Sequence, residues 1–152
     1  MKIIDDIIEA HIFRLIEGRI EFLLLKRAAN EVYPLLWQPV TGRMNEGETA
    51  YEAALREIAE ETNLTPGEFW VVPNVNSFYN PNKDTVSLIP VFVGRVAADS
   101  VITISEEHDD YGWFEFEEAI RLMAWPGQRK SAEIINRYFH HEKYYFELIK
   151  LI

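Results

Sequence analysis

The stretch GRMNEGETAYEAALREIAEETNL, residues 42–64, decides the fold of this chain. Its second half, residues 49–62, is rich in Ala, Leu and Glu, which are strong helix formers. On that helix Glu57, Glu60 and Glu61 stand at positions i, i+3 and i+4, so the three carboxylates point the same way. Oxygen ligands at this density are what hard cations such as Mg²⁺ or Mn²⁺ prefer, although a solvated acidic helix face is the common alternative.

The same helix has a separate apolar face. Tyr51, Leu55 and Ile58 fall on it, and we expect them to pack on a sheet. Ala50 and Ala53 lie on the glutamate side, where their small side chains would let a ligand or the preceding loop approach closely. The helix is therefore expected to present carboxylates on one face and to contribute to the core with another.

The rest of the chain predicts a mixture of strands and helices. Strands are expected over residues 8–16, 20–27, 69–79, 85–97, 100–105 and 111–116, and helices over residues 117–124 and 128–145. The first two strands are joined by Glu17-Gly18-Arg19, which favours a hairpin. Since no repeat, low-complexity tract or linker interrupts the pattern, residues 1–152 are expected to form a single domain. Its predicted fold class is α/β, a sandwich around a mixed β-sheet.

The composition excludes several classes of protein. The 4 Trp, 7 Tyr and 9 Phe among 152 residues supply enough apolar area for a core, which excludes a disordered chain. The absence of cysteine excludes a disulfide framework, a zinc–thiolate site, an iron–sulfur cluster and a cysteine nucleophile. No signal peptide or membrane-spanning stretch is visible, so a cytoplasmic protein with no membrane partner is expected.

The net charge of −10 is unevenly distributed. Residues 42–64 carry six acids and two bases, and residues 105–118 carry seven acids and no base, so the remainder of the chain is close to neutral. An acidic field of this size repels nucleic acid and anionic membranes. It also disfavours small anionic substrates, unless a divalent cation inverts the local charge. The acidity is therefore gathered in two segments, and a divalent cation bound there would make a phosphate-bearing small molecule an expected partner.

Residues 42–64 resemble the Nudix box, G-x5-E-x7-R-E-U-x-E-E-x-G-U, where U is a bulky apolar residue. Eight of the nine fixed positions match: Gly42, Glu48, Arg56, Glu57, Ile58, Glu60, Glu61 and Leu64. Asn63 stands where the family has Gly, and Asn is the next-best residue for a left-handed helix cap. The resemblance implies a Nudix-type α/β/α sandwich and hydrolysis of a phosphoanhydride bond.

The resemblance also assigns roles to residues of the box. The implied ligands of Mg²⁺, or of Mn²⁺, are Glu57, Glu60, Glu61 and the carbonyl oxygen of Thr41. Arg56 would hold a box glutamate by an ion pair, and Glu48 would steady Arg56. The metal would neutralise the diphosphate and activate a water for attack on phosphorus, without a covalent intermediate.

A further carboxylate is expected from outside the box, as general base or extra metal ligand. Glu107 is the candidate, because Glu107, His108, Tyr111 and Trp113 form E-H-x-x-Y-x-W, which resembles a stretch of one Nudix branch. The alternative is a solvated acidic turn at residues 106–110. His108 is expected to be structural or solvent-exposed rather than a base.

Resemblance to that branch extends to W-Q-x-V-T-G at residues 37–42, which is similar to bacterial dihydroneopterin triphosphate and dATP pyrophosphohydrolases. The candidate substrate contacts are Arg27, Trp37, Gln38, Phe78 and Tyr79. Aromatic side chains among them would stack on a flat base or pterin ring, although aromatic residues on strands more often belong to the core.

The first prediction is therefore a Mg²⁺-dependent pyrophosphohydrolase that cleaves a nucleoside or pterin triphosphate to the monophosphate and pyrophosphate. The alternatives are a dinucleoside polyphosphate or nucleotide-sugar hydrolase, and a catalytically silent Nudix-fold module that senses a ligand or binds a protein. Retention of all three glutamates favours an enzyme. The C-terminal run YYFELIKLI, residues 144–152, is expected to dock on the domain or on a second subunit. The second alternative would make the protein a homodimer.

Overall fold

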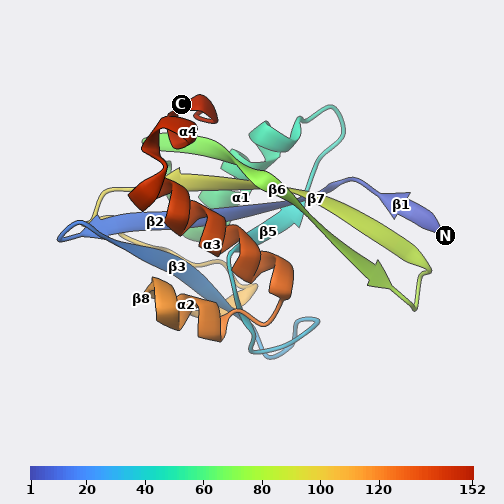
Figure 1. Cartoon of the computed structure of the whole chain (residues 1–152). Coiled ribbons are helices and arrows are strands. Elements are labelled where there is room, and N and C mark those ends of the chain that lie inside the picture. The colour runs from blue at the N-terminus through green and yellow to red at the C-terminus, as the bar shows by residue number, and fades with distance from the viewer.

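The computed structural model describes all 152 residues, which form one mixed sheet between two layers of helices (Figure 1). The strands are β1 (Lys2–Ile4), β2 (Ile7–Ile16), β3 (Arg19–Arg27), β4 (Trp37–Gln38), β5 (Val40–Arg43), β6 (Glu68–Asn80), β7 (Thr85–Arg95) and β8 (His108–Glu115). The helices are α1 (Ala50–Thr62), α2 (Phe116–Leu122), α3 (Pro126–His141) and α4 (Lys143–Leu148). The predicted α/β sandwich around a mixed sheet is confirmed.

Strand β2 lies at the centre of the sheet. It pairs with β3 and β5 in antiparallel fashion and with β7 in parallel fashion. β6 extends the sheet beyond β7, while β4 and β8 both pair with β3. The loop between β5 and α1 therefore starts from the middle of the sheet, where β5 is paired with β2.

Alternate residues of β2 serve the two core layers. Ile8 and Ala10 face α1 and pack in one cluster with Ile58. Phe13 faces the other side, where it joins a second cluster with Trp70 of β6 and Ile135 of α3. Because successive side chains of a strand point to opposite faces, one apolar strand can support both helical layers.

The second half of the chain differs from the sequence-based expectation in three places. The strand expected over residues 111–116 begins earlier, at His108, and ends at Glu115. Residues 100–105, expected as a strand, run as an irregular segment past the end of α1, held there by the bond from Thr103 N to Thr62 O (3.0 Å) and by the buried Ile102. The helix expected over residues 128–145 breaks at Glu142 (φ −136°, ψ 49°), which turns α4 back toward the sheet.

The C-terminal segment docks on its own domain. Phe146 stacks on Trp70 with ring centroids 4.3 Å apart, and Leu151 N donates to the carbonyl of Phe69 at 2.7 Å. Val71 N in turn donates to the carbonyl of Ile149 at 3.1 Å. The end of the chain thus pairs with the inner part of β6. No helix of the structure is both long enough and apolar enough to span a bilayer.

Candidate active site

Helix α1 begins directly after the loop of residues 42–49 because its first turn is fully capped. Thr49 Oγ1 accepts a hydrogen bond from Glu52 N (3.2 Å), and Glu52 Oε2 accepts one from Thr49 N (3.0 Å). At the other end Asn63 adopts the left-handed conformation (φ 61°) and its N–H bonds the carbonyl of Ala59. The turn expected at Asn63 is confirmed, so this departure from the family pattern leaves the helix end intact.

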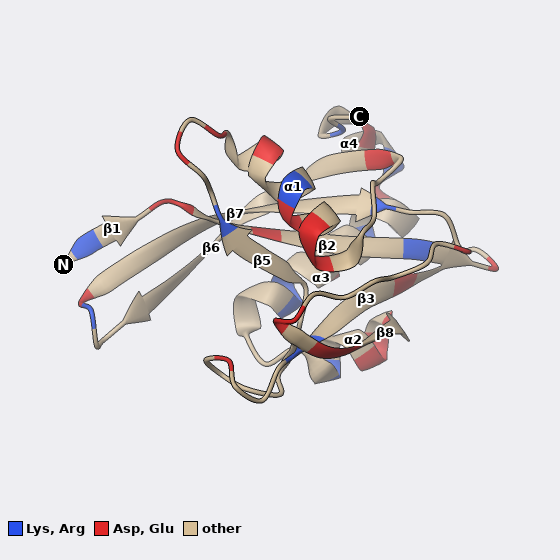
Figure 2. Ribbon diagram, turned by 180° about the vertical axis from the view of Figure 1, so that it is seen from behind, with Lys and Arg blue, Asp and Glu red and all other residues tan.

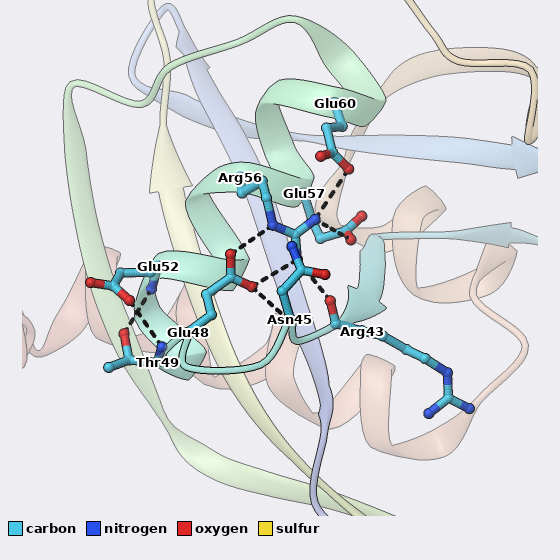
Figure 3. A network of polar contacts seen from close by, with 8 residues as sticks. All are labelled: Arg43, Asn45, Glu48, Thr49, Glu52, Arg56, Glu57 and Glu60. Atoms are coloured by element: carbon cyan, nitrogen blue, oxygen red, sulfur yellow. Dashed lines mark hydrogen bonds and ion pairs between the residues drawn. The ribbon is translucent and has the colours of Figure 1, made fainter.

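Arg56 connects the loop to three glutamates (Figure 3). Its Nε and Nη2 donate to the two carboxylate oxygens of Glu48 at 2.7 and 2.8 Å. Its Nη1 donates to Glu57 at 2.8 Å and to Glu60 at 3.1 Å. Hydrogen bonding from Arg56 lowers the pKa of Glu48 to about 2, and hydrogen bonding to Glu48 raises the pKa of Arg56 further above its ordinary value.

The loop itself is fixed by the same group of residues. Arg56 Nη2 donates to the carbonyl of Arg43 at 2.8 Å, and Asn45 N donates to Glu48 Oε1 at 3.1 Å. A guanidinium that binds one carboxylate through two nitrogens has a defined orientation. Arg56 and Glu48 therefore hold the loop in one conformation above the end of β5.

Glu57 lies against the backbone of β5. A Cβ added to Gly42 would come 2.2 Å from Glu57 Cδ, so only glycine leaves room for this carboxylate. The side chain of Glu57 is 12% exposed, and burial raises its pKa against the opposing effect of Arg56. Gly42 is thus required by the position of Glu57 and by no special backbone angle.

Glu61 is buried and meets residues from a distant segment. Ser105 Oγ donates to Glu61 Oε2 at 2.8 Å, and His108 Nδ1 lies 2.8 Å from the same oxygen. Burial raises the pKa of Glu61, but His108 and Ser105 together outweigh it and the pKa is lowered. Glu61 is therefore held as a carboxylate in a fixed orientation.

Glu107 joins the same cluster from the turn before β8. Its backbone carbonyl accepts from Ala28 N at 3.0 Å, and its N–H contacts Ser105 Oγ at 3.4 Å. Burial, then the charge of Glu61 and a hydrogen bond to it, raise the pKa of Glu107. The structure thus brings Glu107 to Glu61 of α1. In the ribbon of Figure 2 the acidic residues are seen on α1 and near the start of β8.

These carboxylates have the chemistry of a Mg²⁺ site but are engaged with protein partners. No group of three or more Asp, Glu or His side chains is arranged to hold a metal ion in this structure. Glu57 and Glu60 bind Arg56, and Glu61 binds His108 and Ser105. Glu60 is 56% exposed and is held by one hydrogen bond, so it is free to turn toward a cation. The donor set of hard oxygens fits Mg²⁺ or Mn²⁺.

Three of the five expected substrate contacts lie on the paired strands β3 and β4. Trp37 packs edge-on against Phe114 (5.3 Å), and Gln38 is buried beside it in β4. Arg27 Nε donates to the carbonyl of Val32 at 2.6 Å, which ties Arg27 to the loop that follows β3. In this structure Trp37 and Arg27 have intramolecular partners.

The other two, Phe78 and Tyr79, lie on the outer half of β6. They are 47% and 53% exposed, and the Tyr79 hydroxyl donates to Asp84 at 2.8 Å. Among the strands β6 pairs only with β7, and β2 lies between β7 and the β3–β4 pair. The structure therefore separates these two aromatic residues from the β3–β4 group.

Two features of the site were not expected from the sequence. Ser105 lies in the segment expected as a strand, and nothing in its spacing relates it to Glu61. The second feature is Glu9, which lies opposite Thr41 in the β2–β5 ladder, is 2% exposed, and binds His11 Nε2 at 2.8 Å. A sequence signal existed for this pair, since Glu9 and His11 are the two polar residues, two apart, of the otherwise apolar run 7–13.

Residues 8–138 match the sequence model of the NUDIX domain. The asymmetrical bis(5'-nucleosyl)-tetraphosphatase of Caenorhabditis elegans is 30% identical over 113 residues, which cover 73% of this chain and 79% of that protein. The nucleoside triphosphatase NudI of Klebsiella pneumoniae is 34% identical over 112 residues, which cover 68% of this chain and 79% of that protein.

The solved structure of the Escherichia coli dihydroneopterin triphosphate pyrophosphohydrolase is also similar. It superposes with a TM-score of 0.70 at 25% sequence identity, and the match covers 86% of this chain and 94% of that one. The range 8–138 contains the capped helix, its loop and the segment that brings Ser105 and His108 to Glu61.

Proposed function

Because this chain belongs to the Nudix hydrolase family, we propose that it is a divalent-metal-dependent pyrophosphohydrolase that cleaves a nucleoside or pterin triphosphate to the monophosphate and pyrophosphate. The observation that carries the proposal is that Glu107 lies beside Glu61, one of the three glutamates of α1, next to a loop fixed by Arg56. The similarity to a nucleoside triphosphatase and to a dihydroneopterin triphosphate pyrophosphohydrolase supports a triphosphate substrate.

In this proposal Glu57, Glu60, Glu61 and the carbonyl oxygen of Thr41 would hold Mg²⁺, with Mn²⁺ as a substitute. When bound, the metal supplies neutralisation of phosphate charge and acidification of a water molecule. Glu61 is pre-oriented for this role by His108 and Ser105, since partners of a ligand fix its direction.

Side chains of the protein have the remaining roles, which are positioning and proton transfer. Arg56 and Glu48 keep the loop and Glu57 in place, and we assign them a positioning role. Glu107, whose pKa is raised by burial and by Glu61, would accept the proton that leaves the attacking water. A base with a raised pKa holds that proton more firmly than an ordinary carboxylate does.

Hydrolysis of a dinucleoside polyphosphate is the second candidate. It is favoured by the 30% identity to the C. elegans tetraphosphatase. The two candidates differ in products, since a diadenosine tetraphosphate cut asymmetrically yields ATP, whereas a triphosphate yields monophosphate and pyrophosphate.

A substrate panel tests the proposal. The protein is incubated with Mg²⁺ and, separately, deoxynucleoside triphosphates, dihydroneopterin triphosphate, diadenosine tetraphosphate and ADP-ribose, and the products are separated chromatographically. Monophosphate plus pyrophosphate supports the first candidate, and ATP from the dinucleotide supports the second. No turnover of any substrate with Mg²⁺ or Mn²⁺ overturns both and favours a silent module.

Site variants are part of the same experiment. Glu60→Gln and Glu61→Gln are expected to lower kcat/KM by at least about 100-fold, more than loss of a residue that merely orients a ligand. Glu107→Gln should lower kcat/KM by a smaller factor than either of these variants. Glu46→Gln, an exposed glutamate of the same loop, is the matched control and should stay near the wild-type rate. Near-normal rates in both box variants would overturn the metal assignment.

A further inference from the structure

The outer part of the β6–β7 hairpin, residues 74–90, forms a projecting arm that carries almost no charge (Figure 1). Lys83 and Asp84 at its turn are its only charged residues, although 26% of the whole chain is charged. The ribbon coloured by charge shows the same arm almost entirely uncharged, next to β1 and the N-terminus (Figure 2). The arm is therefore a neutral projection from a domain with a net charge of −10.

One edge of this arm has no strand partner. The inner part of β6 is covered by the C-terminal segment, through the bonds of Phe69 and Val71 to residues 149–152. Beyond this point β6 pairs with β7 alone, from Val75 to Asn80. An exposed strand edge presents unpaired N–H and C=O groups that another strand can bind, and charged residues or proline usually prevent this. Residues 75–80 contain neither.

The ladder determines which residues point their backbone groups outward. In an antiparallel pair, residues that exchange hydrogen bonds alternate with residues that do not. Phe69 and Val71, which bond the C-terminal segment, face away from β7 and lie opposite Gly94 and Phe92. Pro90 continues this alternation on β7 and has no N–H, so the pair of Val75 and Pro90 is one that does not exchange hydrogen bonds. By alternation the backbone groups of Val75, Ser77 and Tyr79 face the free edge.

The side chains of the same three residues share one face of the arm. They lie opposite Pro90, Leu88 and Val86, which alternate with Ile89 and belong to the face of the sheet on which α1 packs. Val75 is 60% exposed, Tyr79 53% and Leu88 41%. An apolar surface thus continues along the free edge where α1 no longer covers the sheet.

We propose that this edge joins two copies of the chain, with β6 of each copy paired antiparallel about a two-fold axis at Ser77. In that register Val75 lies opposite Tyr79 of the partner subunit, Ser77 opposite Ser77 of the partner subunit, and each pair exchanges two backbone hydrogen bonds. An aromatic residue opposite a β-branched one is a favourable cross-strand pair.

A second copy fits the edge for reasons of charge as well as shape. The bodies of two copies repel each other through their acidic charge, so a neutral surface is where their approach costs least. No like charges meet at the proposed axis. When two copies of residues 75–79 pair in opposite directions, Val75 of each copy meets Tyr79 of the partner subunit, and the two Ser77 residues meet at the centre. The interface uses no residue of α1, so the test of the dimer does not depend on whether the proposed reaction takes place.

A single introduced cysteine tests the geometry, because the chain contains none. Across the axis the two Ser77 Cα atoms would be about 5.5 Å apart, which is within the range of a disulfide. Ser77→Cys is therefore expected to form a reducible covalent dimer under mild oxidation. Val101→Cys, at a residue 78% exposed and outside the arm, is the matched control and should stay monomeric. Cross-linking of Ser77→Cys no faster than the control overturns the proposal.

Sedimentation velocity at micromolar concentrations provides the second part of the test. The wild-type chain is expected to sediment as a dimer, and Ser77→Lys, which places two ammonium groups face to face, as a monomer with an unchanged circular dichroism spectrum. Val101→Lys carries the same charge elsewhere and should remain dimeric. A monomeric wild-type chain, or a Ser77→Lys variant that remains dimeric, overturns the proposal.

Discussion

His108 Nδ1 lies 2.8 Å from Glu61 Oε2, which joins the first residue of β8 to the last turn of α1. Both side chains are 6% exposed, and Ser105 Oγ contacts the same carboxylate oxygen at 2.8 Å. Glu61 is therefore oriented by a segment more than forty residues later in the chain. In the proposed role of Glu61 as a metal ligand, this fixed orientation would leave little to be ordered when a cation binds.

Replacing His108 with Ala is expected to weaken metal binding. Loss of a residue that orients a metal ligand typically costs about 10–100-fold in metal affinity or activity. The Mg²⁺ concentration that gives half-maximal activity should rise by about that factor, while Ser105 still holds Glu61 in part. His141→Ala, an exposed histidine at the end of α3, is the control. An unchanged Mg²⁺ titration in the His108 variant would show that Glu61 needs no such partner.

Gly42→Ala tests the close contact between β5 and Glu57. The added methyl would come 2.2 Å from Glu57 Cδ, so the carboxylate must move and its bond with Arg56 is strained. We expect a loss of about 1–3 kcal/mol of stability, as for an overpacked site, together with a fall in kcat/KM. Thermal unfolding and steady-state kinetics measure the two effects.

The control for this variant is Gly67→Ala. A Cβ at Gly67 meets nothing within 4 Å, and no positive φ is recorded there. That substitution should leave both stability and kcat/KM close to wild type. If Gly42→Ala behaves in the same way, Glu57 is mobile and its placement against β5 is irrelevant to activity.

The ion pair between Glu48 and Arg56 predicts a pH dependence of stability. Arg56 lowers the pKa of Glu48 from 4.5 to about 2, so the folded chain binds the proton less readily than the unfolded chain. The stabilisation is complete above the unfolded pKa and is lost as the pH falls through the folded value. The difference in unfolding free energy between wild type and Glu48→Gln should be constant above pH 4.5 and shrink between pH 4.5 and about 2.

Urea denaturation of wild type and Glu48→Gln at several pH values between 2 and 7 measures this difference. Taking the difference cancels the titration of groups common to both proteins. Glu46→Gln removes a glutamate without an ion-pair partner and should show a small difference that does not vary with pH. A constant difference for Glu48→Gln down to the lowest pH would contradict the assignment.

The sequence predicted the parts of the site that depend on local spacing. The helix over residues 49–62 and the turn at Asn63 follow from propensity and capping, and both are present at nearly those bounds. The i, i+3 and i+4 arrangement of the glutamates follows from helical geometry alone. Ala53, however, packs in the core with Ile58 rather than lining the glutamate face, because the sheet approaches α1 from that side as well.

Contacts between distant segments could not be predicted from the sequence. Ser105 and His108 reach Glu61 because β8 pairs with β3, and the register of that ladder is not encoded in a local pattern. The apolar residues near 100–105 suggested a strand, but Ile102 is used to fill the core beside α1. The short strand β1 was not expected, since three residues carry no periodicity that distinguishes a strand from a loop.

The last prediction concerns the buried carboxylate of Glu9, whose two oxygens have different partners. Asn76 Nδ2 donates to Oε1 at 2.7 Å, and His11 Nε2 lies 2.8 Å from Oε2. Asn76→Ala removes the only donor of Oε1 in the protein and leaves that oxygen buried. An unsatisfied buried polar group costs about 1–3 kcal/mol and a charged one costs more, so the free energy of unfolding should fall by at least about 1 kcal/mol.

Urea denaturation of Asn76→Ala is compared with that of Asn82→Ala, at an exposed turn residue of the same hairpin, which should change stability by less than about 0.5 kcal/mol. The double variant with Glu9→Gln separates the lost bond from lost packing. If the bond carries the effect, Asn76→Ala costs less once Glu9 is uncharged, because a neutral amide is less costly to leave unpaired than a carboxylate. An equal cost in both backgrounds would assign the effect to the contact of Asn76 with Gly127, where an added Cβ would come 2.2 Å from Asn76 Oδ1.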